Sequence, residues 1–273
     1  MIALHSEDVE FEGLRGKLRA SGPIDGPGET PLNPGSSRLA PEPVYVLLHG
    51  IGVSHRYLAR LHQVLAESSR TYSIDLPGFG GTPKPGRQLS VEDYASFINS
   101  VLVSRGVESY VLVGHSMGVQ FAIEAALQRP DPVRQVVLMG PVVDSRQRTV
   151  VRQSIALFRD ALFFESPSSN WVVFTDYLRC GIRWYLTELP VMMEYKTEQR
   201  LADAKVPVLV LRGSRDPVAG REWALQLSRT AAEGRLAEIP QCGHVAQHLR
   251  PRAVARAIRS FVAATARPRD PTR

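Results

Sequence analysis

The chain has 273 residues, 44% of them hydrophobic, and its 33 basic and 27 acidic residues give a formal net charge of +6. This length and apolar content suit one α/β domain with an insertion and argue against a disordered or membrane-embedded chain. No window approaches the roughly 20 apolar residues of a membrane span, and residues 1–11 lack the pattern of a secretion signal, so we expect a cytoplasmic protein.

The predicted elements alternate between strands and helices along most of the chain. Residues 9–19 favour one or two edge strands, and residues 21–43, rich in Pro, Gly and Ser, favour a flexible loop. Apolar runs predict strands at 44–48, 71–74, 110–113, 135–139, 207–211 and 235–239. Helices are expected around 57–65, at 91–104, 117–128 and 221–232, and near the end, before a disordered tail at 267–273. Strands that read as continuous Val and Leu are buried on both faces, which predicts a parallel sheet covered by helices.

Residues 144–203 interrupt this alternation. They contain no convincing strand, but they hold nine of the chain's twenty aromatic residues and equal numbers of basic and acidic residues. We interpret them as a helical cap inserted in a core domain formed by residues 1–143 and 204–273. Together the aromatic side chains favour an apolar wall, although packing between cap and core explains any single one of them.

The positive charge is concentrated in residues 204–273, with 13 basic and 5 acidic residues. No aromatic platform or nucleic-acid module accompanies these arginines, so a solvated basic face is favoured over a nucleic-acid site. The two cysteines, Cys180 and Cys242, have no metal-type spacing and are not expected to form a disulfide. We expect a small-molecule substrate, with no metal and no cofactor.

A Gly-His-Ser-Met-Gly sequence at 114–118 stands between an apolar strand and a helix. This placement is typical of a nucleophile elbow, in which a tight turn forces the serine, here Ser116, into a strained backbone. Gly114 and Gly118 are expected because a Cβ at either position would collide with the neighbouring strand or helix.

A serine hydroxyl needs a base and a carboxylate that orients the base. His244 and Asp216 both follow predicted strands, and the carboxyl ends of parallel strands meet at one edge of the sheet. We therefore predict Ser116, Asp216 and His244 as a catalytic triad. Asp144, which follows the strand next to the elbow, is the alternative acid.

The loop His-Gly-Ile-Gly at 49–52 leaves its strand at the same edge. Its glycines let the backbone approach a substrate closely. We predict that the backbone N–H groups of Ile51 and Met117 form an oxyanion hole, the second aided by the dipole of the elbow helix.

These motifs together resemble the α/β-hydrolase superfamily from residue 44 to residue 262. The resemblance rests on His49-Gly50, the Asp-Leu-Pro-Gly-Phe-Gly sequence at 75–80, the elbow at Ser116, Asp216 and Gly243-His244, in the chain order serine, acid, histidine. It implies an α/β-hydrolase fold with about eight mostly parallel strands and a cap inserted after the sixth strand. Dehalogenases and epoxide hydrolases of the superfamily carry an aspartate at the elbow, so Ser116 argues against both.

The favoured interpretation is a serine hydrolase, esterase-like, that cleaves a carboxylic ester, lactone or thioester of a small to medium apolar substrate through an acyl-enzyme on Ser116. A carbon-carbon bond hydrolase of ring-cleavage diketones, or an acyltransferase, would use the same triad. A module that binds a ligand without turnover is the more remote alternative.

Overall fold

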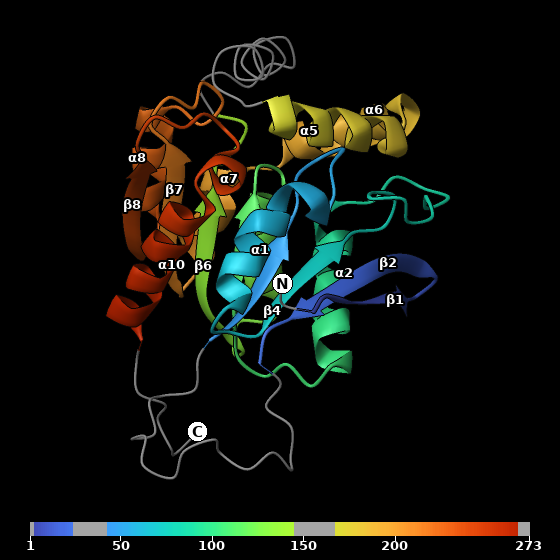
Figure 1. Cartoon of the computed structure of the whole chain (residues 1–273), viewed down its shortest axis with the longest axis horizontal. Helices are drawn as coiled ribbons and strands as arrows, with labels where there is room; N and C mark the ends of the chain where they lie inside the picture. The colour runs from blue at the N-terminus through green and yellow to red at the C-terminus, as the bar shows by residue number, and fades with distance from the viewer. Residues whose placement is uncertain (1–2, 24–42, 145–166, 267–273) are drawn as a thin grey trace.

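The computed structural model describes residues 3–23, 43–144 and 167–266 (Figure 1). The tail expected at 267–273, most of the loop expected at 21–43, and the stretch 145–166 of the expected cap lie outside the described residues. Within the described ranges, no helix is long and apolar enough to cross a membrane.

The strands form one sheet in the order β1-β2-β4-β3-β5-β6-β7-β8. Their bounds are β1 (His5–Phe11), β2 (Leu14–Ser21), β3 (Val44–Leu48), β4 (Thr71–Asp75), β5 (Tyr110–His115), β6 (Val133–Met139), β7 (Pro207–Gly213) and β8 (Glu233–Ile239). The β1–β2 and β2–β4 pairs are antiparallel, and all the other pairs are parallel. The expected sheet of eight mostly parallel strands is therefore confirmed.

From β3 onward, each strand is followed in the described chain by one or more helices. They are the 3-10 helix η1 (His55–Leu58), α1 (Ala59–Ala66), α2 (Val91–Ser104), α3 (Gly118–Gln128), α5 (Pro167–Cys180), α6 (Ile182–Glu194), α7 (Thr197–Asp203), α8 (Arg221–Thr230), α9 (Ala246–Leu249) and α10 (Pro251–Thr265). A capping box starts α2, because the Ser90 hydroxyl accepts the Asp93 N–H and the Asp93 carboxylate accepts the Ser90 N–H.

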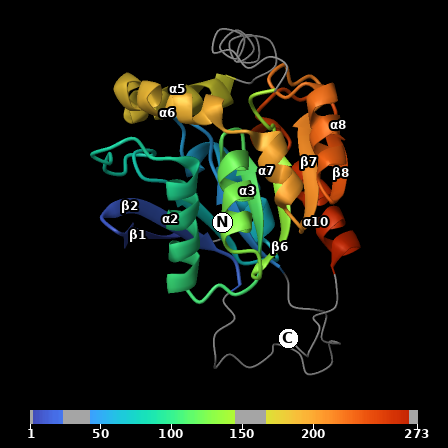
Figure 2. The same ribbon diagram turned by 180° about the vertical axis from the view of Figure 1, so that it is seen from behind.

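Two hydrophobic cores lie on the two faces of the sheet. Alternate side chains of β3 enter different cores. Tyr45 and Leu47 pack with α1 and α10, whereas Val46 and Leu48 pack with α2 and α3. Helices α1 and α10 lie in front of the sheet in the view of Figure 1, and α2 and α3 lie in front of it in the view of Figure 2. Burial on both faces explains why the central strands read as unbroken apolar runs.

Helices α5, α6 and α7 lie between β6 and β7 in the chain. In both views α5 and α6 lie across one end of the sheet (Figures 1 and 2). Helix α7 packs instead against α3 and α8. An ion pair of 2.8 Å between Arg200 of α7 and the buried Glu124 of α3 fixes this contact.

Candidate active site

Ser116 occupies the tight turn between β5 and α3. Its backbone φ of +58° lies in the left-handed region, which residues other than glycine rarely adopt. The turn is held by a 3.0 Å hydrogen bond from the Ser116 N–H to the Met139 carbonyl of the neighbouring strand. A Cβ on Gly114 would overlap the Gly118 carbonyl, and a Cβ on Gly118 would overlap the Leu48 carbonyl. The two glycines therefore have the steric role that the sequence predicts.

The structure brings His244 and Asp216 together. Asp216 follows β7, and its Oδ1 accepts the backbone N–H groups of Val218 and Ala219 at 2.7 and 2.9 Å. Its Oδ2 lies 2.9 Å from Nδ1 of His244. Burial by itself would raise the pKa of Asp216, but attraction to His244 and these hydrogen bonds outweigh it and lower that pKa. The carboxylate is thus ionised and fixed in orientation beside the imidazole.

The His244 ring lies at the end of β6, the strand next to the elbow. A Cβ on Gly140 would be 2.8 Å from Cε1 of His244, and Gly140 has a φ of +54°. Glycine at this position therefore makes room for the ring. Asp144, the alternative acid, is buried a few residues further along the same loop.

Gly50 lies directly against the nucleophile candidate, since a Cβ on Gly50 would be 2.9 Å from the Ser116 Cβ and 3.3 Å from its Oγ. Tyr57 accepts the Gly50 N–H at 2.8 Å. By contrast, the described residues show no hydrogen bond from the backbone N–H of Ile51 or Met117. These are the two groups predicted as oxyanion donors.

His49 fixes the direction of the Ile51 N–H. The Leu76 N–H donates to Nε2 of His49 at 3.1 Å, and burial lowers the pKa of His49, so the neutral ring carries its proton on Nδ1. That Nδ1–H donates to the Gly50 carbonyl at 2.8 Å. In a trans peptide the C=O and N–H point in opposite directions, so the Ile51 N–H points away from His49.

A buried polar chain joins the Gly50 loop to the His244 loop. The Tyr57 hydroxyl lies 2.8 Å from Nδ1 of His115, and Nε2 of His115 lies 2.9 Å from the His244 carbonyl. Burial, followed by repulsion from His244, lowers the pKa of His115 to about 3. The ring is therefore neutral. Its Nδ1 accepts a hydrogen bond from the Tyr57 hydroxyl, and its Nε2–H donates one to the His244 carbonyl. The sequence places Tyr57 in the helix expected around 57–65 and His115 in the elbow, and no local pattern indicates that the two side chains meet.

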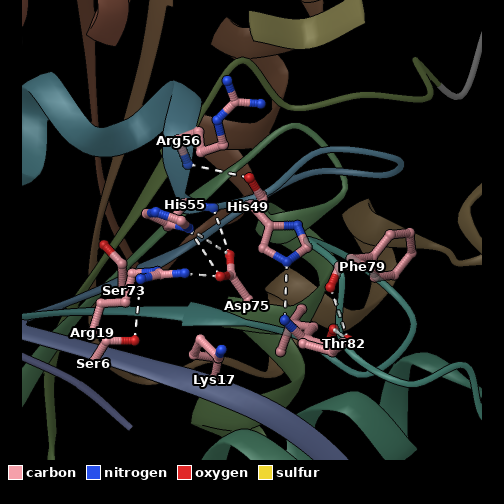
Figure 3. A network of polar contacts seen from close by, with 12 residues as sticks. Ser6, Lys17, Arg19, His49, His55, Arg56, Ser73, Asp75, Phe79 and Thr82 are labelled. Carbon is pink, nitrogen blue, oxygen red and sulfur yellow. Dashed lines mark hydrogen bonds and ion pairs between the residues drawn. The ribbon is translucent and has the colours of Figure 1, made fainter. Parts of the chain in front are cut away.

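Asp75 belongs to a separate network that fixes the start of η1 (Figure 3). Its carboxylate accepts the His55 N–H at 2.7 Å and lies 2.9 Å from Nδ1 of the same histidine. Arg19 of β2 donates to it at 3.3 Å. Burial opposes ionisation, but the hydrogen bond and attraction from His55 lower the pKa of Asp75. This carboxylate thus joins the start of η1, which follows β3, to strand β2.

Side chains of α5 and α6 pack on glycines of these loops. A Cβ on Gly52 would overlap the ring of Tyr177, and a Cβ on Gly78 would overlap the indole of Trp184. Asp176 of α5 is buried, accepting Ser54 Oγ at 2.6 Å and Arg56 Nη1 at 2.8 Å. The two helices are therefore anchored on the loops that follow β3 and β4.

Ser116 occupies a strained strand-to-helix turn, and a paired histidine and aspartate follow other strands at the carboxyl edge of the same mostly parallel sheet. This combination defines the class of α/β proteins with a nucleophile elbow. Residues 45–257 match the alpha/beta hydrolase family. The chain belongs to that family.

Two relatives align over most of the chain. A 2-hydroxy-6-oxo-2,4-heptadienoate hydrolase of Pseudomonas putida is 27% identical, over 80% of this chain and 88% of its own. An (E)-2-((N-methylformamido)methylene)succinate hydrolase of Acinetobacter baylyi is 22% identical, over 81% and 90%. Among solved structures, an enol-lactonase from Burkholderia xenovorans has a TM-score of 0.77 at 17% identity, covering 94% of this chain and 100% of that one. At that identity the likeness establishes the fold alone.

Proposed function

We propose that the protein is a serine hydrolase that cleaves a carboxylic ester, lactone or thioester of a small to medium apolar substrate. Ser116 Oγ attacks the carbonyl carbon, and His244 takes the hydroxyl proton while Asp216 orients the imidazole. The N–H groups of Ile51 and Met117 donate to the oxyanion of the tetrahedral intermediate. As the intermediate collapses, the imidazolium gives its proton to the leaving alcohol or thiol, and the acyl group remains on Ser116. The neutral imidazole then takes a proton from water, which attacks the acyl carbonyl and releases the acid and the Ser116 hydroxyl.

The observation that carries this proposal is the 2.9 Å hydrogen bond between Nδ1 of His244 and Oδ2 of Asp216. It assigns the ring proton to Nδ1 and leaves Nε2 as the nitrogen that accepts a proton from serine. It also supports Asp216, rather than Asp144, as the acid. The ionised Asp216 stabilises the imidazolium that forms in the transition state.

The preference for an apolar substrate is supported by the aromatic side chains that pack on the loops around Ser116. Tyr177, Trp184 and Tyr185 lie on Gly52 and Gly78, the glycines of the loops that follow β3 and β4. Two of the three acidic residues in the described helices α5 and α6, Asp176 and Glu188, are buried. An apolar acyl group would gain about 25 cal/mol for each Å² that it buries against these rings.

Reaction with a fluorophosphonate probe, followed by mass spectrometry, tests the nucleophile. We expect a single adduct on Ser116, no adduct in Ser116→Ala, and loss of ester turnover in that variant. Full turnover by Ser116→Ala would reject the proposal. A panel of aryl esters graded in acyl length then measures the pocket.

A carbon-carbon bond hydrolase is the second candidate, favoured by the Pseudomonas putida relative, which is 27% identical over 80% of this chain. Both reactions would use Ser116, His244 and Asp216. Turnover of a vinylogous diketone at a higher kcat/KM than any aryl ester would select this candidate.

A further inference from the structure

The outward side of α5 and α6 carries an apolar stripe. Among the described residues, seven large hydrophobic side chains are exposed, and five of them lie on these two helices. Their exposed fractions are 65% for Trp171, 54% for Phe174, 66% for Leu178, 71% for Ile182 and 56% for Leu186. Large exposed apolar side chains gathered on one surface are uncommon and mark interaction sites.

The spacing places these side chains on one face of each helix. Trp171, Phe174 and Leu178 follow at intervals of three and four residues on α5, and Ile182 and Leu186 are four residues apart on α6. The opposite faces hold the buried side chains that pack on the loops below. Helices α5 and α6 lie across one end of the sheet (Figures 1 and 2). The exposed side chains therefore lie opposite the faces that pack on the loops after β3 and β4.

The charges along the stripe are basic. Arg179 and Arg183 are exposed and lie between Leu178 and Leu186 in the chain. Two of the three acidic residues of the helix pair, Asp176 and Glu188, are buried, and only Glu194, at the end of α6, is exposed. The surface thus combines an apolar stripe with two exposed arginines, of which Arg179 lies 3.9 Å from the buried Asp176 carboxylate.

We propose that this face docks on an anionic lipid bilayer, with the helix pair lying in the headgroup region. Interfacial helices combine apolar side chains, which enter the headgroup and acyl boundary, with arginines that bind anionic headgroups. A two-fold dimer through the same face would bring Arg179 and Arg183 of both copies into one interface and repel them. The proposal is independent of the hydrolase mechanism, because docking uses the exposed side chains of α5 and α6 and not Ser116, His244 or Asp216.

Vesicle binding by the full chain tests this proposal. We expect the protein to sediment with vesicles of phosphatidylglycerol and phosphatidylcholine at least tenfold more tightly than with pure phosphatidylcholine. Of the three tryptophans, Trp171 is exposed, whereas Trp184 and Trp223 are buried. A blue shift of the emission on binding therefore reports insertion of Trp171, and Trp171→Phe should bind but lose the shift.

Matched variants locate the surface. The double variant Trp171→Ser, Phe174→Ser should weaken binding more than tenfold, and Arg179→Glu and Arg183→Glu should each weaken it at least about fivefold. Val103→Ser, which alters an exposed apolar side chain of α2, and Arg229→Glu, which alters an exposed arginine of α8, should leave binding unchanged. Circular dichroism checks that each variant is folded.

Three results would overturn the proposal. The first is equal affinity for neutral and anionic vesicles, and the second is binding that the control variants weaken as much as the stripe variants do. The third is self-association in sedimentation velocity, abolished by Trp171→Ser, Phe174→Ser, in a protein that binds no vesicles. Ser116→Ala should bind like the wild-type chain, so loss of hydrolysis and loss of docking are measured separately.

Discussion

Replacing Asp216 with Asn tests the proposed acid through the tautomer of His244. In the wild-type chain, Oδ1 of Asp216 accepts two backbone N–H groups and Oδ2 accepts the His244 Nδ1–H at 2.9 Å. The asparagine oxygen must stay with the backbone donors, because an NH2 group cannot accept their protons. The amide N–H then donates to Nδ1 of His244. The imidazole proton moves to Nε2, the nitrogen that should receive the proton of Ser116.

The expected loss of kcat follows from this change of tautomer. In serine proteases a change of the acid to asparagine lowers kcat about 10⁴-fold through the wrong tautomer, which corresponds to about 5.5 kcal/mol of transition-state stabilisation. We expect a loss of this size in kcat for an aryl ester. KM should change by less than about threefold, because the acid does not touch the substrate. Thermal unfolding should change little, because asparagine has the same shape and keeps both backbone hydrogen bonds.

Asp144→Asn is the matched control. It removes a second buried carboxylate from the loop after β6 and should reduce kcat by less than about tenfold. If Asp144→Asn loses as much activity as Asp216→Asn, or if Asp216→Asn keeps more than a tenth of the wild-type kcat, the assignment of the acid is wrong.

Three further predictions concern the surroundings of the site. Tyr57→Phe removes the hydroxyl that the Gly50 N–H and His115 share. We expect the free energy of unfolding to decrease by about 1–3 kcal/mol and kcat to fall at least tenfold. An unchanged kcat would show that the buried chain has no role in turnover. Burial raises the pKa of Glu188 to about 7, so the folded chain binds the carboxyl proton more tightly than the unfolded chain does. The free energy of unfolding should therefore decrease as the pH rises from about 4.5 to 7. Melting temperatures should show that decrease, and Glu188→Gln should remove it; the same decrease in the variant would refute the assignment to Glu188. Gly118→Ala places a Cβ against the Leu48 carbonyl and should prevent folding or lower the melting temperature steeply, whereas Gly86→Ala, which has open space around it, should do neither.

The sheet and the elbow could be predicted because their signals are local in the sequence. Continuous apolar runs indicate strands buried on both faces, and the glycines around Ser116 indicate a turn with no room for a Cβ. Strand ends were less accurate. The strand expected at 110–113 extends to His115, because its last two residues pair with Leu138 and Met139 of β6. Such pairing depends on the neighbouring strand and leaves no mark in the segment itself.

The contacts that join the loops could not be predicted from local patterns. Tyr57 and His115 are 58 residues apart, and both have types and spacings that also suit a buried core. The bond between Ser54 of the loop after β3 and Asp176 of α5 spans 122 residues. A buried polar side chain finds its partner through the tertiary fold, so only the structure can show which donor meets which acceptor.

The loop at 49–54 connects the parts of the proposed mechanism. Gly50 lies against Ser116, Gly52 lies under Tyr177 of α5, and Ser54 is bonded to Asp176 of the same helix. His49 and Tyr57 hold the Gly50 carbonyl and N–H respectively. The proposed donor at Ile51 is therefore oriented by buried groups before any substrate arrives. Because an oxyanion hole acts through dipoles that need no reorganisation during the reaction, a loop anchored on both sides is what this chemistry requires.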